Sequence, residues 1–417
     1  MPTGPRQPID HLLAIHAAAR ARVDGRRATR DWLRQHTLTD KPTAPIRCLA
    51  LGKAACAMAQ GAIDELGPQL VAGLVVTKNG HARPVADWPV LEADHPVPGA
   101  GSLVAGRACS AFARDCHTGD YFLCLLSGGG SALAEDPRPP WDLPAIARLT
   151  DHLLSCGADI GTINRLRSAV SRLKGGGLAR TAMPAKQCTL AISDVAGDDP
   201  ATIASGPTCI APADDDLQAA AKAMAVPADL RHLFSQLATE TLPTGPGGPI
   251  HIIGDNASAR RAAAETAAAA GQPAVILSEL LSGEVTDCAA DLHRAATALP
   301  IGGILIAGGE PTVQLPGDHG RGGRAQQLAL ELARLWQDDR RWLALCGGTD
   351  GTDGPTDANG AWADGQSWHR AHAMGHDPAM HRQRCDAYPL FAALDQLLIT
   401  GPTDTNVMDL ILIERVS

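Results

Sequence analysis

The chain has 417 residues, of which 45% are apolar and 19% charged, as in a globular protein of two or three domains. Its 36 basic and 45 acidic residues give a formal net charge of −9, and aromatic residues make up only 3%. Nucleic-acid binders usually present a basic surface, and single-strand binders add aromatic stacking platforms. These figures therefore exclude nucleic acid as an expected partner.

The sequence also bears on location and redox environment. No apolar run approaches the roughly 18 residues that span a bilayer, so no membrane association is expected. The first 20 residues carry Asp10, His11, His16 and Arg20 where a signal peptide would be apolar. The 11 cysteines are odd in number and form no Cys-x-x-Cys pair, which argues against disulfides and thiolate zinc sites. We expect a cytoplasmic protein.

Short apolar segments alternate along the chain with Ala-, Leu- and Arg-rich stretches of helical period. This alternation is typical of parallel strands joined by crossover helices and predicts an α/β fold. The expected strands are Ile46–Leu51, Leu74–Thr77, Tyr121–Leu126, Thr189–Ser193, His251–Ile253, Ala274–Leu277, Gly303–Ala307, Trp342–Cys346, Leu397–Thr400 and Leu410–Ile413. Most of them run directly into glycine, serine or aspartate. Because open α/β sheets bind ligands outside the carboxyl ends of their strands, we expect the polar chemistry there.

A change in composition marks the expected domain boundary. Thr241–Pro249 is rich in proline and glycine and has neither periodicity nor hydrophobicity, as linkers do. We therefore expect two domains, residues 1–243 and 250–417, each with a mostly parallel sheet and flanking helices. Downstream of the boundary, the alanine-rich segment Ser258–Gly271 predicts a closely packed helix.

The first motif with chemical meaning is Leu49-Ala-Leu-Gly-Lys-Ala-Ala, a buried strand followed by Gly52 and Lys53. A lysine at the start of a helix adds a cation to an end that is already positive, which suggests an anionic ligand. The full Walker A pattern is absent. The alternative is an ordinary surface lysine.

The second motif, from Ser127 through Gly128, Gly129 and Gly130 to Ser131, follows an uninterrupted apolar strand. Three successive glycines cost backbone entropy and are expected where amides must approach a ligand closely. Backbone N–H groups in such a loop can bind phosphate, with two hydroxyls as further donors. The alternative is a plain tight turn between a strand and a helix.

A third segment is basic, and it allows two interpretations. Cations precede the glycines Gly175–Gly177 at Arg165, Arg167, Arg172 and Lys174, in a predicted helix that begins near Asn164. They either form part of an anion site or are the basic last turn of a helix that ends at glycine.

Two acidic loops follow strands. Carboxylates suit Mg²⁺, which is bound in proteins by one or two carboxylates together with substrate phosphates. The alternative for the first loop is capping of a helix N-terminus. The residues are Asp194, Asp198 and Asp199 in the first loop, and Asp350, Asp353 and Asp357 in the second. The spacing of the second loop does not match an EF-hand.

Between these acidic loops, a glycine turn exposes Glu310, and Arg321 and Arg324 flank the start of a leucine-rich helix. Arginine there can hold a phosphoryl group or carboxylate through two parallel hydrogen bonds. His369, His372 and His376 stand near helical spacing, but Gly375 interrupts the helix, so we favour a solvated face over a metal site.

These motifs, in this order, resemble the class II glycerate 2-kinases, the family whose C-terminal part is called the MOFRL domain. The resemblance runs from about Ile9 to Ile413. It is carried by Leu51-Gly-Lys-Ala-Ala, Ser127-Gly-Gly-Gly-Ser-Ala-Leu, Ser193-Asp-Val-Ala-Gly-Asp-Asp, Ala204-Ser-Gly-Pro-Thr, Gly322-Gly-Arg, Gly347-Gly-Thr-Asp-Gly-Thr-Asp-Gly-Pro-Thr-Asp and Thr405-Asn-Val.

The resemblance implies a Rossmann-like domain over residues 1–243 and a MOFRL-type domain over 250–417, with the active site in the cleft between them. It also implies ATP- and Mg²⁺-dependent phosphorylation of D-glycerate at its 2-hydroxyl. Lys53 and Arg324 match positions on which the family's active site relies. The oligomeric state is left open, with a homodimer as one candidate.

We assign roles to the motif residues as follows. Lys53, Arg324 and Asp194 are expected to be catalytic, and Lys53, Arg324 and Asn256 to contact the substrate. The segment Ser127–Ser131 and Glu310 are expected to bind nucleotide or phosphate. Asp194, Asp350 and Asp353 are expected to hold the metal, although one aspartate could instead accept the hydroxyl proton.

The sequence departs from the family pattern at three positions. Ala325 and Gln327 stand where Asn and Glu are expected after the arginine, and Asp404 replaces a common glycine. The first two could alter how Arg324 is braced, so the hydroxy-acid preference is left open. Some relatives are labelled hydroxypyruvate reductase, but no Gly-x-Gly-x-x-Gly follows a strand here with an acidic residue about 20 positions on. A reductase using NAD(P)H and a non-catalytic anion-binding protein remain the alternatives.

Overall fold

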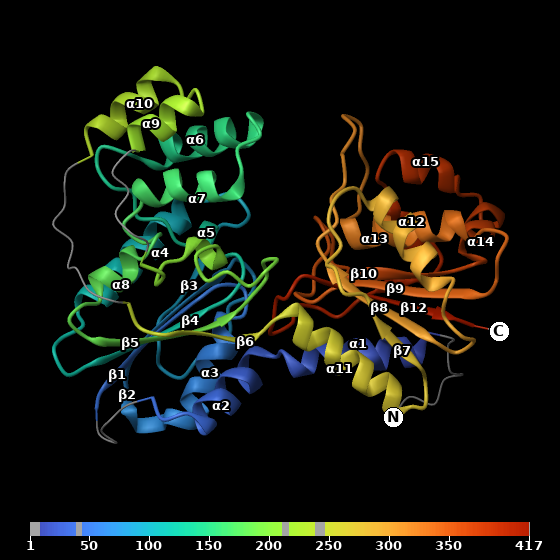
Figure 1. Cartoon of the computed structure of the whole chain (residues 1–417), viewed down its shortest axis with the longest axis horizontal. Helices are drawn as coiled ribbons and strands as arrows, with labels where there is room; N and C mark the ends of the chain where they lie inside the picture. Colours follow the sequence, from blue (N-terminus) through green and yellow to red (C-terminus); the bar gives the residue numbers. More distant parts are fainter. Residues whose placement is uncertain (1–8, 39–43, 211–216, 238–246, 417) are drawn as a thin grey trace. The chain divides into compact units, whose positions relative to one another are not determined.

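The computed structural model describes residues 9–38, 44–210, 217–237 and 247–416. Within these residues the chain forms two compact units (Figure 1). We call residues 25–253 domain A, and residues 254–416 together with 9–24 domain B. The predicted boundary differs in one respect, since the first helix belongs with the C-terminal half of the chain. The predicted linker Thr241–Pro249 lies partly outside the described residues.

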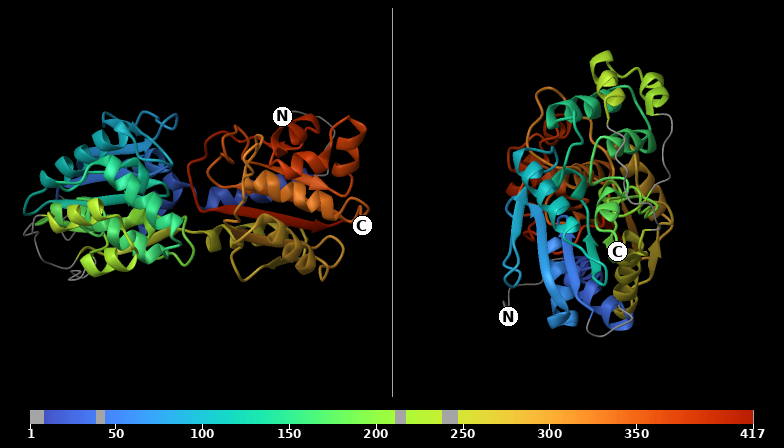
Figure 2. Two further views of the ribbon diagram at one scale, coloured as in Figure 1. Left: turned by 90° about the horizontal axis from the view of Figure 1, so that it is seen from above. Right: turned by 90° about the vertical axis from the view of Figure 1, so that its left-hand side faces the viewer.

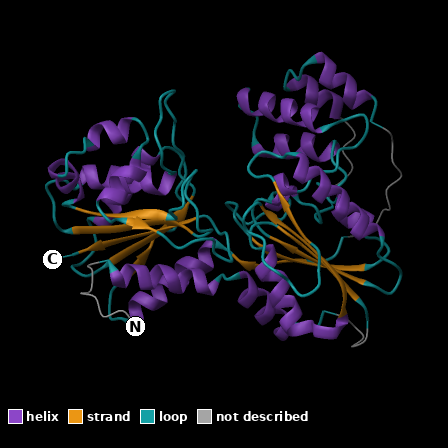
Figure 3. Cartoon of the chain, turned by 180° about the vertical axis from the view of Figure 1, so that it is seen from behind, coloured by secondary structure: helices purple, strands orange, loops and turns teal. Residues whose placement is uncertain are grey.

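Domain A is a sheet with helices on both faces (Figure 3). Its strands are β1 (Ile46–Leu51), β2 (Leu70–Lys78), β3 (Val90–Ala93), β4 (Tyr121–Leu126), β5 (Lys186–Ile192) and β6 (Ile250–Gly254). Its helices are α2 (Gly25–Gln35), α3 (Ala55–Leu66), α4 (Ala100–Arg114), α5 (Gly130–Leu133), α6 (Leu143–Ser155), α7 (Ile160–Ala169), α8 (Gly177–Thr181), α9 (Leu217–Ala223) and α10 (Ala228–Ser235), with 3-10 turns η1 (Gly67–Gln69) and η2 (Ile203–Ser205).

The strands of domain A are ordered β3-β2-β1-β4-β5-β6, which is the order of a doubly wound nucleotide-binding sheet. The pairs from β3 through β5 are all parallel. Central strands such as β4 are apolar along their whole length because helices cover both of their faces. A separate apolar cluster joins α6, α7, α9 and α10 around Trp141, Leu149 and Phe234.

Domain B is a mixed sheet, also covered by helices on both faces. Its strands are β7 (Ala274–Ile276), β8 (Ile304–Gly309), β9 (Trp342–Gly348), β10 (Gly360–Asp364), β11 (Leu397–Leu398) and β12 (Asp409–Arg415). Its helices are α1 (Asp10–Arg22), α11 (Asn256–Ala269), α12 (Val285–Ala296), α13 (Arg324–Leu335), α14 (Ser367–Ala373), α15 (Pro378–Gln383) and α16 (Ala387–Ala393).

The prediction of a mostly parallel second sheet is wrong. The strand order is β11-β10-β9-β12-β8-β7, and of the pairs in the described residues only β7–β8 is parallel. The last strand, β12, inserts between β8 and β9 and runs against both. The apolar run Leu410–Ile413, from which this strand was predicted, indicates that the strand is buried but carries no information about its direction.

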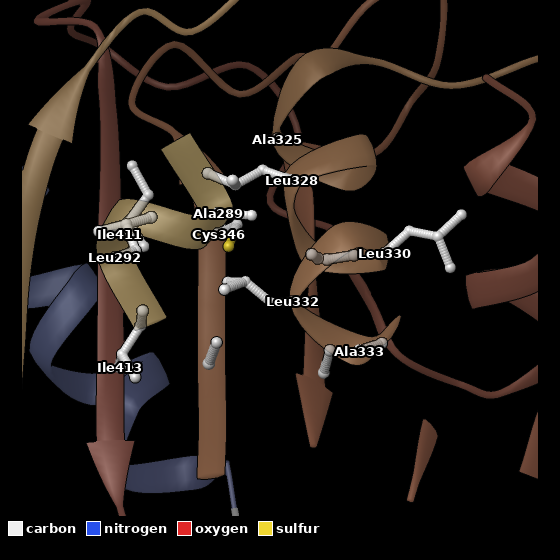
Figure 4. Packing of buried hydrophobic residues seen from close by; sticks show 14 of the residues in the cluster. Ala289, Leu292, Ala325, Leu328, Leu330, Leu332, Ala333, Cys346, Ile411 and Ile413 are labelled. Atoms are coloured by element: carbon white, nitrogen blue, oxygen red, sulfur yellow. The ribbon is translucent and has the colours of Figure 1, made fainter. Parts of the chain in front are cut away.

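The core of domain B lies between this sheet and the helices α12 and α13. Figure 4 shows Leu292 of α12 and Leu328 of α13 packed with Cys346 of β9 and Ile411 of β12. On the opposite face, α1 packs against α11 (Figure 1). In the view from above, α1, in blue, again lies among the elements of domain B (Figure 2). None of the helices in the described residues is both long and apolar enough to cross a membrane.

Candidate functional site

The glycine-rich segments of domain A gather at the carboxyl edge of its sheet. β1 and β4 are adjacent and parallel, with Leu51 opposite Leu126, so the segments that follow them leave the same edge side by side. From β1 the chain proceeds outward to β3, and from β4 it proceeds to β6 on the other side. Doubly wound sheets bind their ligands at such a reversal point. Lys53 and the Ser127–Ser131 loop both lie there.

Ser127 ties these two loops together. The backbone N–H of Ala54 donates to Ser127 Oγ over 3.0 Å, and that of Lys53 donates to the carbonyl of Gly128 over 2.9 Å. Gly52 has φ +132°, and a Cβ there would lie 2.2 Å from Ser127 Oγ, so the approach requires glycine. Because Ser127 is fully buried, its hydroxyl fixes the loop, and direct ligand contact by that hydroxyl stays a prediction.

Lys53 runs alongside the middle of the glycine loop. Gly129 has φ +85°, and a Cβ there would lie 3.4 Å from Lys53 Cγ and 3.0 Å from His95 Cδ2. His95 follows β3, a short strand that the sequence patterns did not predict. The structure therefore adds an imidazole to the residues expected beside this loop.

The basic third segment differs from its prediction. α7 ends at Ala169, so Lys174, Gly175 and Gly176 form a turn before α8 rather than the end of α7, and Gly177 is the first residue of α8. Gly175 donates its backbone N–H to Ser205 O over 3.0 Å, and Gly176 donates to Gly206 O over 2.8 Å. The loop is thereby fixed to the Ala204-Ser-Gly-Pro-Thr motif.

The Ala204-Ser-Gly-Pro-Thr motif also contacts the Ser127–Ser131 loop. A Cβ at Gly130 would come within 2.8 Å of Ala204 Cβ, and the hydroxyls of Ser131 and Ser205 are 2.8 Å apart. Three glycine-rich segments that lie far apart in the sequence thus form one cluster. The sequence indicated each of them but not their contact.

Asp194 lies two residues beyond the end of β5. Because β5 is parallel to β4, Asp194 lies at the same edge as the Ser127–Ser131 loop. Asp199 has a local structural role, since its carboxylate accepts the backbone N–H of Ala201 over 3.0 Å. Of these two residues, Asp194 is thus the better placed for ligand chemistry.

In domain B the antiparallel strand β12 brings Asp409 to the edge where β8 and β9 end. Asp409 lies opposite Gly309 of β8 and Gly348 of β9. Glu310 and Asp350 follow these two strands closely. Asp409 is 3% exposed. It was not among the predicted site residues, because it immediately precedes the apolar run that signalled the strand.

Arg324, the first residue of α13, is held by two carboxylates. Its Nε donates to Asp409 Oδ2 over 2.8 Å and its Nη2 to Asp409 Oδ1 over 3.1 Å, while Nη1 donates to Glu310 Oε1. Burial lowers the pKa of Arg324, but the charges and hydrogen bonds of Asp409 and Glu310 outweigh burial and raise it above its ordinary value. These bonds use three of the five guanidinium N–H donors, so the arginine is oriented and keeps donor capacity.

The departures from the family pattern lie away from these partners. Ala325 is buried, and its backbone N–H donates to Asp353. Gln327 is also buried, and its side chain donates to the carbonyl of Arg382 over 3.0 Å. Neither side chain therefore braces Arg324.

Asp353 caps the helix that Arg324 begins. Its two carboxylate oxygens accept the backbone N–H groups of Ala325 and Gln326 over 3.1 and 2.8 Å. Burial, and next the charge of Asp409, raise the pKa of Asp353 to about 7. A metal ion at Asp353 would have to displace this cap, so its role as a ligand stays a prediction.

Asn256 is 2% exposed, and its side chain is directed at the backbone. Its Nδ2 donates to the carbonyls of Val407 and Asp409 over 2.8 and 3.0 Å. A Cβ at Gly308 would lie 1.9 Å from Asn256 Oδ1, so the glycine makes room for the amide. Asn256 thus braces the start of β12, and substrate contact by this residue stays a prediction.

Within the described ranges no three His, Cys, Asp or Glu side chains are grouped so that they could hold a metal ion, and this includes His369, His372 and His376. Asp194 and Asp350 belong to different domains. A site of one or two carboxylates, completed by substrate phosphates, is compatible with this donor set.

Comparison with known proteins agrees with this geometry. Residues 11–239 match the domain of unknown function DUF4147, and residues 303–409 match the MOFRL family. A D-glycerate 2-kinase from Thermotoga maritima is 36% identical over 375 residues, which cover 87% of this chain and 89% of that protein. A protein from Agrobacterium vitis named as a hydroxypyruvate reductase is 37% identical over 378 residues, which cover 87% and 98%.

A solved structure also matches. The crystal structure of glycerate kinase from Thermotoga maritima superposes with a TM-score of 0.87 at 34% identity, covering 98% of this chain and 99% of that one. These similarities span both domains, including the segments that carry Lys53 and Arg324. The chain therefore belongs to the glycerate 2-kinase family, whose C-terminal part is the MOFRL domain.

Proposed function

We propose that the protein is a glycerate 2-kinase, which transfers the γ-phosphoryl group of ATP to the 2-hydroxyl of D-glycerate. The observation that carries the proposal is the position of Lys53 beside Gly129 at the reversal point of a doubly wound sheet. Relatives named glycerate kinase that align over most of the chain support the substrate class.

Phosphoryl transfer depends mainly on positioning and on neutralising charge. Lys53 supplies an ammonium next to a loop whose backbone N–H groups can bind phosphate oxygens. Arg324 supplies a rigid guanidinium that Asp409 and Glu310 keep in one orientation. Each such group contributes about 3 kcal/mol to transition-state stabilisation, by analogy with single electrostatic donors in other enzymes.

Asp194 is the proposed acceptor of the proton that leaves the glycerate hydroxyl. In the overall reaction the hydroxyl oxygen bonds to phosphorus, ADP leaves, and the hydroxyl proton is released. Asp350 is the proposed carboxylate ligand of Mg²⁺. Asp194 would be a ligand instead of the proton acceptor if another aspartate took the proton, and Asp353 would join only if its helix cap opened. Magnesium, when bound, neutralises phosphate charge and orients the transferred group.

The proposal requires Lys53 and Arg324, which lie in different domains, to serve one reaction. A site in the cleft between the domains stays a prediction. Cytoplasmic location and dimer formation also stay predictions.

The test is a pair of assays on the same preparation. The first follows ADP formation with ATP, Mg²⁺ and D-glycerate, omitting each in turn. The second follows oxidation of NADH and NADPH with hydroxypyruvate. A kinase forms ADP only with all three components and leaves both nicotinamides unoxidised. Nicotinamide oxidation without ADP formation would identify a reductase, and neither activity would identify a non-catalytic binder.

A further inference from the structure

Three charged side chains, Glu135, Arg167 and Lys174, lie together next to the Ser127–Ser131 loop in domain A. Lys174 and Glu135 form an ion pair and are 3% and 0% exposed. Arg167, on α7, is half-buried and lies close enough for its charge to act on both of them. Two cations thus share one carboxylate. Because the buried Lys174 already pairs with Glu135, the half-buried Arg167 has no carboxylate of its own among the described residues, and a partly desolvated cation of this kind favours an anionic ligand.

Arg167, the cation without its own carboxylate, contacts the Ser127–Ser131 loop. Arg167 Nη2 donates to Ser131 Oγ over 3.1 Å, whereas its Nε is buried and has no hydrogen-bond partner among the described residues. Glu135 Oε1 is likewise buried without a partner there. Arg167 is therefore anchored to Ser131 by one donor and keeps others for a ligand, since a guanidinium has five.

Ser131 begins a chain of hydrogen bonds that ends at Asn164. The hydroxyls of Ser131 and Ser205 are 2.8 Å apart, and Ser205 Oγ donates to Asn164 Oδ1 over 3.5 Å. Arg167 donates to the Ser131 hydroxyl, and the Ser205 hydroxyl donates to the amide oxygen of Asn164. In the bond between the two serines, Ser131 is therefore the donor and Ser205 the acceptor. Because the amide oxygen of Asn164 accepts the bond from Ser205, its two Nδ2 donors are not used by it and can serve another acceptor.

The backbone holds Ser205 in this position at a cost. Ala204 and Ser205 have φ of +52° and +60°, a left-handed conformation that is uncommon for residues other than glycine. The N–H groups of Gly175 and Gly176 hold the segment by donating to the carbonyls of Ser205 and Gly206. Conformations of this kind persist at ligand-binding sites, where surrounding contacts stabilise them.

We infer that Arg167 and Asn164, one turn apart on α7, bind a phosphate group against the Ser127–Ser131 loop. Residues three apart in a helix lie on the same face, which allows both side chains to contact one ligand. The inference rests on the proposed function for the identity of the ligand. Two sources carry the same chemistry, namely the phosphates of the nucleotide and the phosphate of the phosphorylated acid.

The test measures binding to the full-length protein by isothermal titration calorimetry. The probes are ADP, 2-phosphoglycerate and, as a ligand without phosphate, D-glycerate. The variants are Arg167→Gln, Arg167→Lys and Asn164→Asp. Arg148→Gln is the matched control, because Arg148 is an exposed arginine of the same domain that pairs with Asp229 on the surface.

Arg167→Gln is expected to weaken binding of ADP or of 2-phosphoglycerate by about tenfold to a hundredfold, the usual effect of losing a charge-assisted hydrogen bond. Arg167→Lys keeps the charge and should recover part of the affinity. Asn164→Asp places a carboxylate beside the phosphate and should weaken the same ligand at least as much. The ligand that is affected identifies the source of the phosphate, and Arg148→Gln should change neither affinity.

Affinities for ADP and 2-phosphoglycerate that stay within twofold of the wild type in a folded Arg167→Gln protein would overturn the inference. Weakened binding of glycerate alone would do so too, because it would indicate a carboxylate site. If Arg167→Gln does not fold, the affinities of Arg167→Lys and Asn164→Asp for ADP and 2-phosphoglycerate test the inference, and values within twofold of the wild type for both variants would overturn it.

Failure of the proposed function gives a different result. A wild-type protein that binds ADP or 2-phosphoglycerate, yet forms no ADP from ATP and glycerate, would contradict the kinase proposal and leave the phosphate site testable with these variants. A wild-type protein that binds neither phosphate ligand would overturn both.

Discussion

Asp409 holds Arg324 through two parallel hydrogen bonds, from Nε over 2.8 Å and from Nη2 over 3.1 Å. The pair joins the first residue of α13 to the first residue of β12, which are 85 positions apart in the sequence. Paired donors on a planar guanidinium fix both its position and its rotation. Asp409 is therefore expected to determine where Arg324 presents its remaining donors.

Asp409→Asn keeps the shape of the side chain and removes its charge. We expect kcat/KM with glycerate to fall about a hundredfold, because a misoriented Arg324 no longer meets the developing phosphoryl charge. Arg324 is about one-third exposed. The loss in unfolding free energy should therefore be about 1 to 2 kcal/mol, below the value for a fully buried pair. Steady-state kinetics and urea unfolding measure the two effects.

The control for Asp409→Asn is Asp291→Asn, since Asp291 pairs with Arg294 on the exposed surface of the same domain. Its unfolding free energy should change by less than about 0.5 kcal/mol and its kinetics should not change. Equal effects of the two substitutions on kcat/KM would contradict the role assigned to Asp409.

Lys53→Ala is expected to lower kcat at least a hundredfold while the protein stays folded. The expected cause is loss of a positioned cation worth about 3 kcal/mol in the transition state. Kinetics and circular dichroism provide the measurement, with Lys222→Ala on α9 as the control. Near-normal turnover of Lys53→Ala would exclude Lys53 from the reaction.

If Lys53 and Arg324 serve one reaction, their effects should not add. Groups that act as a unit show strongly non-additive losses in turnover. The double variant Lys53→Ala, Arg324→Gln should therefore lose clearly less activity than the product of the two single losses. Losses that multiply fully would indicate that the two residues act independently.

Gly52→Ala tests the junction between the Lys53 and Ser127 loops. The added Cβ would lie 2.2 Å from Ser127 Oγ and 2.4 Å from Ser127 O, so the loops must separate. Gly119→Ala is the matched control, because Gly119 also has positive φ (+99°) but no atom within 4 Å of the added Cβ. We expect Gly52→Ala to be about 1 to 3 kcal/mol less stable than Gly119→Ala, with activity lost only at Gly52. Equal stability and activity would contradict the described contact.

Asp353 predicts a specific pH dependence of stability. Its pKa is raised from 3.8 to about 7, first by burial and next by the charge of Asp409, so the folded protein binds a proton that the unfolded chain releases near pH 4. Protonation of Asp353 therefore adds to the unfolding free energy in full below about pH 4, and this addition is lost as the pH rises to about 7.

Asp353→Asn removes this titration. The unfolding free energy of the wild type, relative to that of Asp353→Asn, should therefore increase as the pH is lowered from 7 to 4. Urea unfolding at several pH values measures this difference, in which carboxylates common to both proteins largely cancel. A difference that stays constant, or that decreases toward low pH, would contradict the raised pKa.

Much of the fold follows from local sequence pattern. All ten predicted strands are present, and β1, β4 and the alanine-rich α11 lie close to their predicted positions. The two strands that were missed, β3 and β10, are short. Strand direction in domain B, and the packing of α1 onto α11, depend on tertiary contacts, many of them between segments distant in the sequence, which local pattern does not encode.

The candidate site was predictable residue by residue but not as an arrangement. Glycine and cation patterns indicated Lys53, the Ser127–Ser131 loop and Arg324. Asp409 and His95 were missed because one precedes an apolar strand and the other follows an unpredicted strand. Only the folded chain shows that Asn256 and Asp353 contact backbone groups, since spacing alone does not distinguish a buried brace from a ligand.

Phosphorus NMR of the products formed from ATP, Mg²⁺ and D-glycerate tests most directly whether the protein phosphorylates glycerate. We predict one new phosphomonoester signal, that of 2-phosphoglycerate, which grows together with the ADP signals and is absent with Lys53→Ala or Arg324→Gln. ATP that stays intact with a folded wild-type protein would contradict the kinase activity, and equal amounts of product with the wild type and both variants would contradict the roles of Lys53 and Arg324.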